Sequence, residues 1–237
     1  MIFENVNREN KAADADPESV RMSMDTKAVI NVGPYSRGGK SRGLRPVAAA
    51  DHDMMAKKKL VPGGILERRC GRPFLFFTGS NKTSDFMVDG IEWWWRENQQ
   101  RMESIKRLVV NMDNGPECSG HRSQFPRRMV DFADRVKLEI RLIYYPPYHS
   151  KYNGIERYWG GLERSRNGYL LESIEEVLMR ARQFVWRATQ TTSTLLKGIY
   201  EKGVKHCGKE KREIEKRLCR SEKLPSWDIS ILPLLVD

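Results

Sequence analysis

The chain has 237 residues, of which 39% are hydrophobic and 31% are charged, so it can form one sizeable core with appendages but hardly two full domains. Lysine and arginine number 42 against 31 aspartate and glutamate, and the formal net charge of +11 favours a polyanionic partner, most commonly nucleic acid. No apolar run is long enough to span a membrane, the N-terminus has no apolar leader, and the four cysteines form no C-x-x-C pair. These features argue against a membrane protein, a secreted protein, a zinc ribbon and a disulfide framework, and they indicate a soluble protein of the reducing cytoplasm.

The first predicted element is a short strand, because Val20, Met22 and Met24 alternate with polar side chains. Asp25 lies near the end of this strand. Residues 26–58 then combine glycine, proline and clustered basic side chains, which predicts a basic loop insertion. This loop is a candidate for holding a phosphate backbone, although a solvated loop without a partner explains the same composition.

The apolar pattern after the loop switches between the periods of strands and helices. We predict, in chain order, hairpin strands over 60–66 and 73–77, a helix from Phe86 to about Asn98 with Thr83-Ser84-Asp85 as capping residues, a strand over 108–113 and a helix over 125–136. These are followed by a half-exposed strand over 138–144, a helix containing Glu156, and a helix over 174–188 with Ser173 as its cap. The three tryptophans at 93–95 are expected to lie mainly in the core, with one of them exposed. From about residue 192 the pattern fades into lysine-rich segments, which predicts a peripheral tail.

This order of elements is the one that an α/β fold of the ribonuclease-H-like type requires, with a mixed sheet flanked by helices. We expect the domain to span residues 19–191, after a lead-in over 1–18 and before a C-terminal tail over 192–237. The basic loop over 26–58 is an insertion within the domain.

Three acidic residues are expected at one edge of this sheet. Asp113 ends an apolar strand that Asn114-Gly115-Pro116 terminates, so its carboxylate lies at a carboxyl end, where ligands bind in open α/β sheets. Asp25 ends the first strand, and Glu156 lies beside the apolar stripe of a helix. Carboxylates suit Mg²⁺ or Mn²⁺, and two such ions promote in-line displacement at phosphorus. The pattern therefore predicts a metal-dependent phosphoryl-transfer site.

Five segments that follow one another in the chain carry a resemblance to a known family. They are Ser23-Met24-Asp25-Thr26-Lys27, Gly33-Pro34-Tyr35-Ser36-Arg37-Gly38-Gly39-Lys40-Ser41-Arg42, Ala50-Asp51-His52-Asp53, Asp113-Asn114-Gly115-Pro116-Glu117 and Tyr145-Pro146-Pro147-Tyr148-His149-Ser150-Lys151-Tyr152-Asn153. The sequence resembles the catalytic domain of DDE insertion-sequence transposases, in particular the ISAzo-thirteen group, over nearly the whole chain. By this resemblance the catalytic and metal-binding triad is Asp25, Asp113 and Glu156, separated by 88 and 43 positions.

The resemblance implies an enzyme that hydrolyses phosphodiester bonds at insertion-sequence ends and joins the resulting 3′-hydroxyl to target DNA, using two Mg²⁺ or Mn²⁺ ions. It implies transposon ends and target DNA as partners, no membrane, a homodimer on DNA by analogy, and a nucleoid-associated place in the bacterial cytoplasm. The side chains expected to contact DNA are Arg37, Lys40, Arg42, His149, Lys151 and Arg157.

Two departures from the family pattern bear on activity. Gly154 stands where the family usually has proline, which loosens the entry to the helix that carries Glu156. Family members also carry an N-terminal helix-turn-helix region that recognises the ends of the element, whereas only 24 residues precede Asp25 here. We therefore expect a truncated product that is inactive in transposition alone and retains metal binding or weak nicking.

Alternatives stay open for single residues and for the function. The cluster Asp51-His52-Asp53 competes with Asp25 for the role of first acidic ligand, although it lies in the loop. Glu117 is either a further ligand or a solvated carboxylate, and His149 either steers a phosphate or packs under the proline-rich loop. The functional alternatives are a DNA-binding remnant without chemistry and a nuclease of the same fold.

Overall fold

A mixed β-sheet forms the centre of the structure, a computed structural model that describes residues 1–40, 48–50, 56–146, 149 and 152–234. The helices are α1 (Ile2–Ala15), α2 (Ser84–Asn98), the 3₁₀ turn η1 (Gln99–Met102), α3 (Gln124–Val136), α4 (Gly154–Ser165), α5 (Ile174–Gln183) and α6 (Gly208–Lys216). The strands are β1 (Ser19–Thr26), β2 (Ile30–Val32), β3 (Lys58–Glu67), β4 (Pro73–Thr78), β5 (Arg107–Asp113), β6 (Glu139–Tyr145), β7 (Val185–Trp186), β8 (Thr189–Gln190), β9 (Thr192–Leu195), β10 (Leu218–Arg220) and β11 (Asp228–Ile231).

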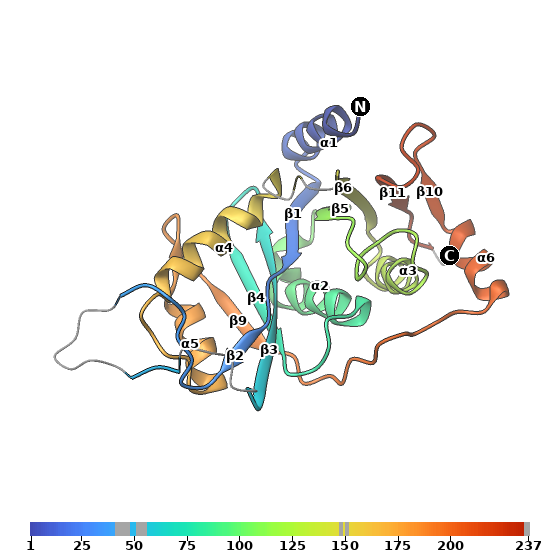
Figure 1. Cartoon of the computed structure of the whole chain (residues 1–237). Coiled ribbons are helices and arrows are strands. Elements are labelled where there is room, and N and C mark those ends of the chain that lie inside the picture. The colour runs from blue at the N-terminus through green and yellow to red at the C-terminus, as the bar shows by residue number, and fades with distance from the viewer. Residues whose placement is uncertain (41–47, 51–55, 147–148, 150–151, 235–237) are drawn as a thin grey trace.

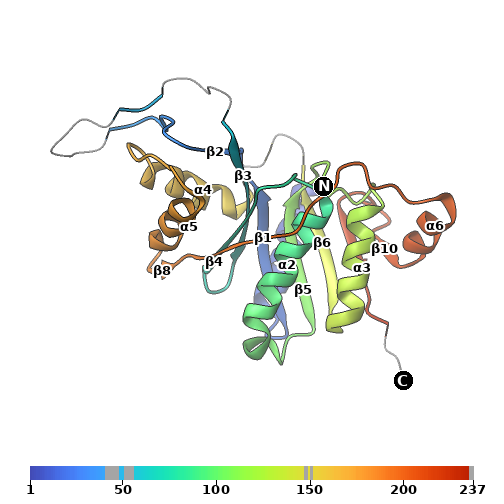
Figure 2. The same ribbon diagram turned by 90° about the horizontal axis from the view of Figure 1, so that it is seen from below.

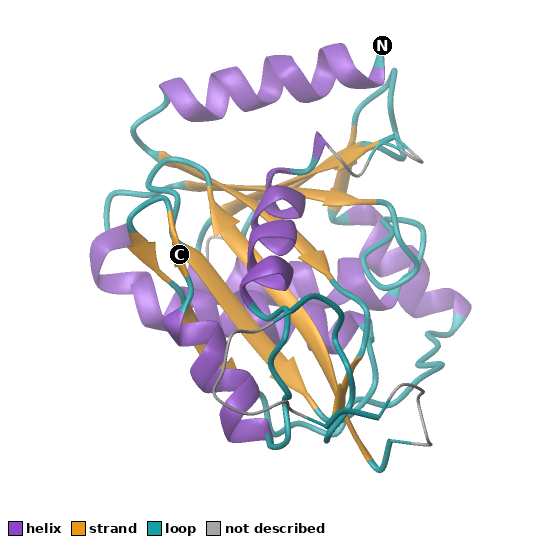
Figure 3. Ribbon diagram, turned by 60° about the vertical axis from the view of Figure 1, so that its left-hand side comes forward, coloured by secondary structure: helices purple, strands orange, loops and turns teal. Residues whose placement is uncertain are grey.

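The strand order along the main sheet is β10-β11-β6-β5-β1-β3-β4-β9, and β2 pairs with β3 beside this path. β5 runs parallel to both β1 and β6, whereas β3 is antiparallel to both β1 and β4. Helices cover both faces of the sheet (Figure 3). A hairpin joined to parallel strands, with the first strand in the middle, is the ribonuclease-H-like arrangement that the sequence predicts.

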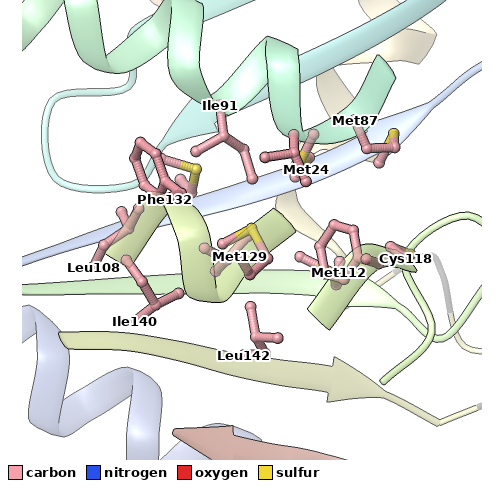
Figure 4. Packing of buried hydrophobic residues seen from close by; sticks show 14 of the residues in the cluster. Met24, Met87, Ile91, Leu108, Met112, Cys118, Met129, Phe132, Ile140 and Leu142 are labelled. Atoms are coloured by element: carbon pink, nitrogen blue, oxygen red, sulfur yellow. The ribbon is translucent and has the colours of Figure 1, made fainter. Parts of the chain in front are cut away.

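The largest apolar core lies between the sheet and helices α2 and α3, which run side by side across it (Figure 2). Met24 of β1, Ile91 of α2 and Met129 of α3 are among its buried members (Figure 4). A second core lies on the opposite face, where α4 and α5 pack over β3 and β4. Among the described residues, no helix is both long and apolar enough to cross a membrane.

The elements with the clearest apolar period form as predicted. β3 and β4 pair as an antiparallel hairpin, and the run of tryptophans at 93–95 packs into the core with its third member partly exposed. The Thr83 hydroxyl accepts a hydrogen bond from the Phe86 amide at 3.3 Å, which caps α2. The Ser173 hydroxyl accepts one from the Glu176 amide at 3.1 Å, which caps α5.

The last predicted helix is shorter than expected. It was expected to reach Ala188 but ends at Gln183, and the chain then turns through the hairpin of β7 and β8. Arg187 and Ala188 have φ values of 47° and 64°, which are left-handed and incompatible with a continuing helix. The turn brings Phe184 against Tyr158 of α4, with ring centroids 5.5 Å apart, so packing on α4 overrides the local helical pattern.

The C-terminal region is also more integrated than predicted. Residues 192–237 were expected to be a peripheral tail, yet β9 pairs with β4 and β11 pairs with β6, so this region adds strands at both ends of the main sheet. Ile229 and Ile231 are fully buried in the main core. This region therefore belongs to the same folded unit as the central strands.

Two other segments are more regular than predicted. The lead-in over 1–18 forms α1, and its Val6 packs against Ile143 of β6, so the strand that was expected to be half-exposed is covered on its second face. Within the predicted loop over 26–58, the short strand β2 pairs with β3. Figure 1 shows α1 lying above the same sheet edge at which α4 begins.

Candidate active site

Asp25 and Asp113 are at the carboxyl ends of neighbouring parallel strands. β1 and β5 pair with a constant offset of 88 positions, as in the pair Ser23 and Asn111. Continued by two residues, this register puts Asp25 opposite Asp113, and adjacent strands lie about 4.8 Å apart. Both side chains point to the sheet face opposite α2 and α3, because their neighbours one residue earlier, Met24 and Met112, belong to the core beneath those helices.

The helix α4, which carries Glu156, lies unusually close to the sheet. Gly64 of β3 pairs with Asp25 across the sheet, and a Cβ atom on Gly64 would come within 2.7 Å of the Trp159 ring and 2.8 Å of the Ile155 side chain. Because Gly64 has no side chain, α4 packs directly on the backbone of β3. This close approach brings Glu156 to the two aspartates.

A buried polar link between Ser23 and Asn153 ties the start of α4 to β1. The Asn153 side chain is fully buried and donates a hydrogen bond to the Met24 carbonyl at 3.0 Å. The Ser23 hydroxyl donates to the Asn153 side-chain oxygen and accepts from the Ile155 amide at 3.0 Å. These bonds join the two segments that flank Asp25 and Glu156.

The three carboxylates influence one another's charge. Burial, followed by the charges of Glu156 and Asp113, raises the pKa of Asp25 to about 7. Burial and the charge of Glu156 also raise the pKa of Asp113. Lys27 donates a hydrogen bond to Glu156 Oε2 at 3.1 Å, so one cation already neutralises part of this charge. Burial has the largest single effect and would lower the pKa of Lys27, but the bond to Glu156 and the charges of Glu156, Glu163 and Asp25 together outweigh it, so this pKa is raised.

The donor set suits a hard divalent cation, although the carboxylates do not form a closed cage. Among the described residues, no three His, Cys, Asp or Glu side chains are grouped closely enough to hold an ion by themselves. Asp113 Oδ1 is buried and has no hydrogen-bond partner in the described part of the chain, so this oxygen is available to coordinate a cation. All three candidate ligands supply oxygen, which is the donor type that Mg²⁺ and Mn²⁺ prefer.

Two of the predicted DNA-contacting residues, Arg37 and Lys40, lie away from the triad. The loop of Arg37 and Lys40 packs near the C-terminal end of α4, where the Gly168 amide donates to the Gly38 carbonyl at 2.9 Å. Arg157 is exposed on the first turn of α4, directly after the predicted catalytic residue of that helix.

Two of the residues with open alternatives make contacts of their own. The His149 ring contacts Phe3 of α1 edge-on, with centroids 5.0 Å apart, and stacks with Tyr152 at 6.0 Å. Glu117 forms an ion pair with Lys82 at 3.3 Å. Arg42, Lys151 and the competing cluster Asp51-His52-Asp53 lie outside the described residues.

Several residues that shape the site carried no predicted role. Ser23 is two positions before Asp25 and Lys27 is two positions after it. Because the side chains of a strand alternate between its faces, all three are expected on the same face, and this spacing could have identified Ser23 and Lys27 from the sequence. Asn153 stands directly before the predicted helix, at the position where asparagine is a common N-cap. The contribution of Gly64 depends on which helix crosses its strand, and no local pattern reveals that.

Comparison with known proteins gives one family and one group of solved structures. Residues 1–233 match the family model described as the Rhodopirellula transposase DDE domain. No curated protein matches the chain. The structure is similar to a Mos1 transposase paired-end complex with left transposon end, at a TM-score of 0.50 and 12% identity over 73% of this chain and 49% of that one.

A second similar structure is the Mos1 mariner paired-end complex with Mn, at a TM-score of 0.50 and 13% identity over 73% of this chain and 49% of that one. At these identities the likeness is one of fold. The chain spans about half the length of the solved proteins that it matches.

Proposed function

The chain belongs to the family of Rhodopirellula transposase DDE domains, and from this premise we propose that it cuts and joins DNA phosphodiester bonds at Asp25, Asp113 and Glu156. The observation that carries the proposal is the register of β1 against β5, which supports adjacent places for the two aspartates. The close packing of α4 on Gly64 supports the third place, that of Glu156.

In this proposal the three carboxylates hold two divalent cations, Mg²⁺ or Mn²⁺. When bound, such ions activate the attacking oxygen and neutralise the charge that develops on the leaving oxygen. Asp113 offers its unpaired buried oxygen, and Asp25 and Glu156 supply the negative charge that attracts a cation. Lys27 balances Glu156 and offers an ammonium group to a phosphate oxygen beside the site.

The substrate in this proposal is DNA, with insertion-sequence ends as donor and a second duplex as target. The similar solved structures are transposase complexes, one of them with a transposon end, and the net charge of +11 fits a polyanionic substrate. Backbone contacts dominate such binding, so affinity should fall steeply as salt rises. The homodimer on DNA stays a prediction.

Nicking of a supercoiled plasmid at low salt, with Mg²⁺ or Mn²⁺, tests the proposal. The Asp113→Asn variant should lose about 100-fold or more of the nicking rate, because the metal ions contribute several kcal/mol to such reactions. The matched control is Asp131→Asn on α3, an exposed aspartate remote from the site that pairs with Arg127. It should nick at the wild-type rate.

The outcomes separate three functions. Metal-dependent nicking that only Asp113→Asn abolishes supports an active phosphoryl-transfer site. DNA binding without nicking, together with no thermal stabilisation by Mn²⁺, would identify a DNA-binding remnant. Free ends without joined strands would identify a nuclease of the same fold.

A further inference from the structure

A groove crosses the start of α4 on the face of the sheet that carries the catalytic carboxylates. A cavity of about 370 Å³ lies between α1 and the first residue of α4, and a second of about 170 Å³ lies between that residue and the β7–β8 hairpin. The two cavities share Arg68, Tyr152 and Gly154 in their linings, so they lie next to each other at the start of α4, and together they are called the groove below. Figure 1 shows the beginning of α4 close to α1.

The groove carries positive charge that the described residues do not balance. Arg68, Arg157 and Arg187 line it, and within the described ranges none of the three has a carboxylate partner. Arg21 also lines the groove, but its guanidinium is paired with Asp14 at 2.8 Å. No aspartate or glutamate of the described part of the chain lines either cavity. Uncompensated guanidinium groups that face one groove attract an anion.

The guanidinium of Arg68 fills the space where residue 154 would have a side chain. A Cβ atom on Gly154 would overlap Nη1 of Arg68 and come within 2.9 Å of its Cζ. A proline at this position, as in the family pattern, has a Cβ atom and would displace the guanidinium. The absence of a side chain at position 154 therefore lets the Arg68 guanidinium lie at the N-terminus of α4. The positive end of the helix dipole at this point also favours an anion.

We propose that this groove binds the backbone of a single-stranded DNA segment next to the scissile phosphate, with Arg68 as the central phosphate contact. The inference rests on the proposed function, and it adds a binding site outside the catalytic carboxylates. Gly154, which lines both cavities, is two positions before Glu156, so the groove begins on the same first turn of α4 as this carboxylate.

Aromatic side chains favour a nucleic-acid strand over a small anion. Tyr152 lines both cavities and is 54% exposed, although its ring also stacks with His149, and Trp186 lines the second cavity with the Arg187 guanidinium 5.5 Å from its ring centre. Unpaired bases stack on such rings while arginines hold the phosphates between them. A free phosphate ion would use the guanidinium groups and leave the aromatic rings unused.

The test is the affinity of the whole chain for a fluorescein-labelled single-stranded oligodeoxynucleotide, measured by fluorescence anisotropy in EDTA over a series of salt concentrations. Arg68→Gln should weaken binding about tenfold, as expected for a charge-assisted contact, and should reduce the slope of log affinity against log salt by about 0.7. The matched control is Arg96→Gln, which removes the same charge from an exposed position on α2, across the sheet. It should bind like the wild type.

Gly154→Ala is the second variant, because it displaces the Arg68 guanidinium without changing the net charge. It should weaken binding to a similar extent as Arg68→Gln, while circular dichroism shows both variants to be folded. The inference is overturned if Arg68→Gln binds like Arg96→Gln, if Gly154→Ala binds like the wild type, or if inorganic phosphate at matched ionic strength displaces the oligodeoxynucleotide. Since EDTA removes the metal, these results are independent of the plasmid-nicking test, so either proposal can fail alone.

Discussion

Breaking the buried link between Ser23 and Asn153 should destabilise the domain and loosen the helix that carries Glu156. Asn153→Ala removes two hydrogen bonds, one to the Met24 carbonyl and one from the Ser23 hydroxyl, and leaves both of those groups buried. At about 1 kcal/mol per bond, with a further cost of about 1 kcal/mol for the unsatisfied partners, the expected loss is about 2–3 kcal/mol. For a chain of this size that lowers the unfolding midpoint by about 5–10 °C.

Urea unfolding, followed by tryptophan fluorescence and circular dichroism, measures this loss. Ser23→Ala removes the bonds to Asn153 and to the Ile155 amide and should cost about 2 kcal/mol. Because the two side chains share a bond, the double variant should lose about 1 kcal/mol less than the sum of the single losses. The control is Asn7→Ala, at an exposed position of α1, which should change stability by less than about 0.5 kcal/mol.

Two results would refute this reasoning. One is a loss below about 0.5 kcal/mol for Asn153→Ala, which would mean that water replaces the bonds at no cost. The other is strict additivity of the two substitutions, which would mean that Ser23 and Asn153 act independently.

Three further predictions concern other parts of the fold. Gly64→Ala should cost about 1–3 kcal/mol in urea unfolding, because the added methyl group would overlap Trp159, and it should weaken Mn²⁺ binding in calorimetry; unchanged values would contradict the close approach of α4. Asp25→Asn should raise the thermal midpoint in EDTA, since it removes one of three clustered carboxylates, and should abolish stabilisation by Mg²⁺; a lower midpoint in EDTA would speak against clustering. Arg217 holds the pKa of Asp134 below its ordinary value of 3.8, so the contribution of this ion pair to the free energy of unfolding is complete above pH 3.8 and is lost as the pH falls through the pKa of the folded state. Asp134→Asn should therefore make the free energy of unfolding less dependent on pH in that acid range. An unchanged pH dependence would show that the pair contributes nothing.

The sequence predicts the central elements well because their apolar patterns are long. The hairpin of β3 and β4, the helices α2 and α3 and the strand that ends at Asp113 each bury a regular row of side chains, which periodicity detects. The strands β9, β10 and β11 have only three or four residues, too few to show a period, and β9 and β11 lie far along the chain from their partners β4 and β6. The end of α5 is missed for another reason, since Phe184 fits the helical pattern but packs against Tyr158.

At the candidate site, the sequence identifies which residues carry chemistry but not what positions them. The separation of 88 between Asp25 and Asp113 is visible in the sequence, yet it becomes a structural fact only because β1 and β5 pair with that same offset. The contact between Arg68 and Gly154 joins positions 86 apart and leaves no local pattern in either segment. Such contacts depend on how α4 crosses the sheet, which is a property of the whole fold.

The positions of β9 and β10 at opposite ends of the sheet have a consequence for folding of the chain during its synthesis on the ribosome. The strands that carry the carboxylates emerge early, but the sheet they form keeps two open edges until the residues after 192 have been made. Open edges invite pairing with other chains, and contacts between distant segments form slowly. The partly made chain is therefore vulnerable to aggregation until the strands of the C-terminal region have been made and have docked on the sheet.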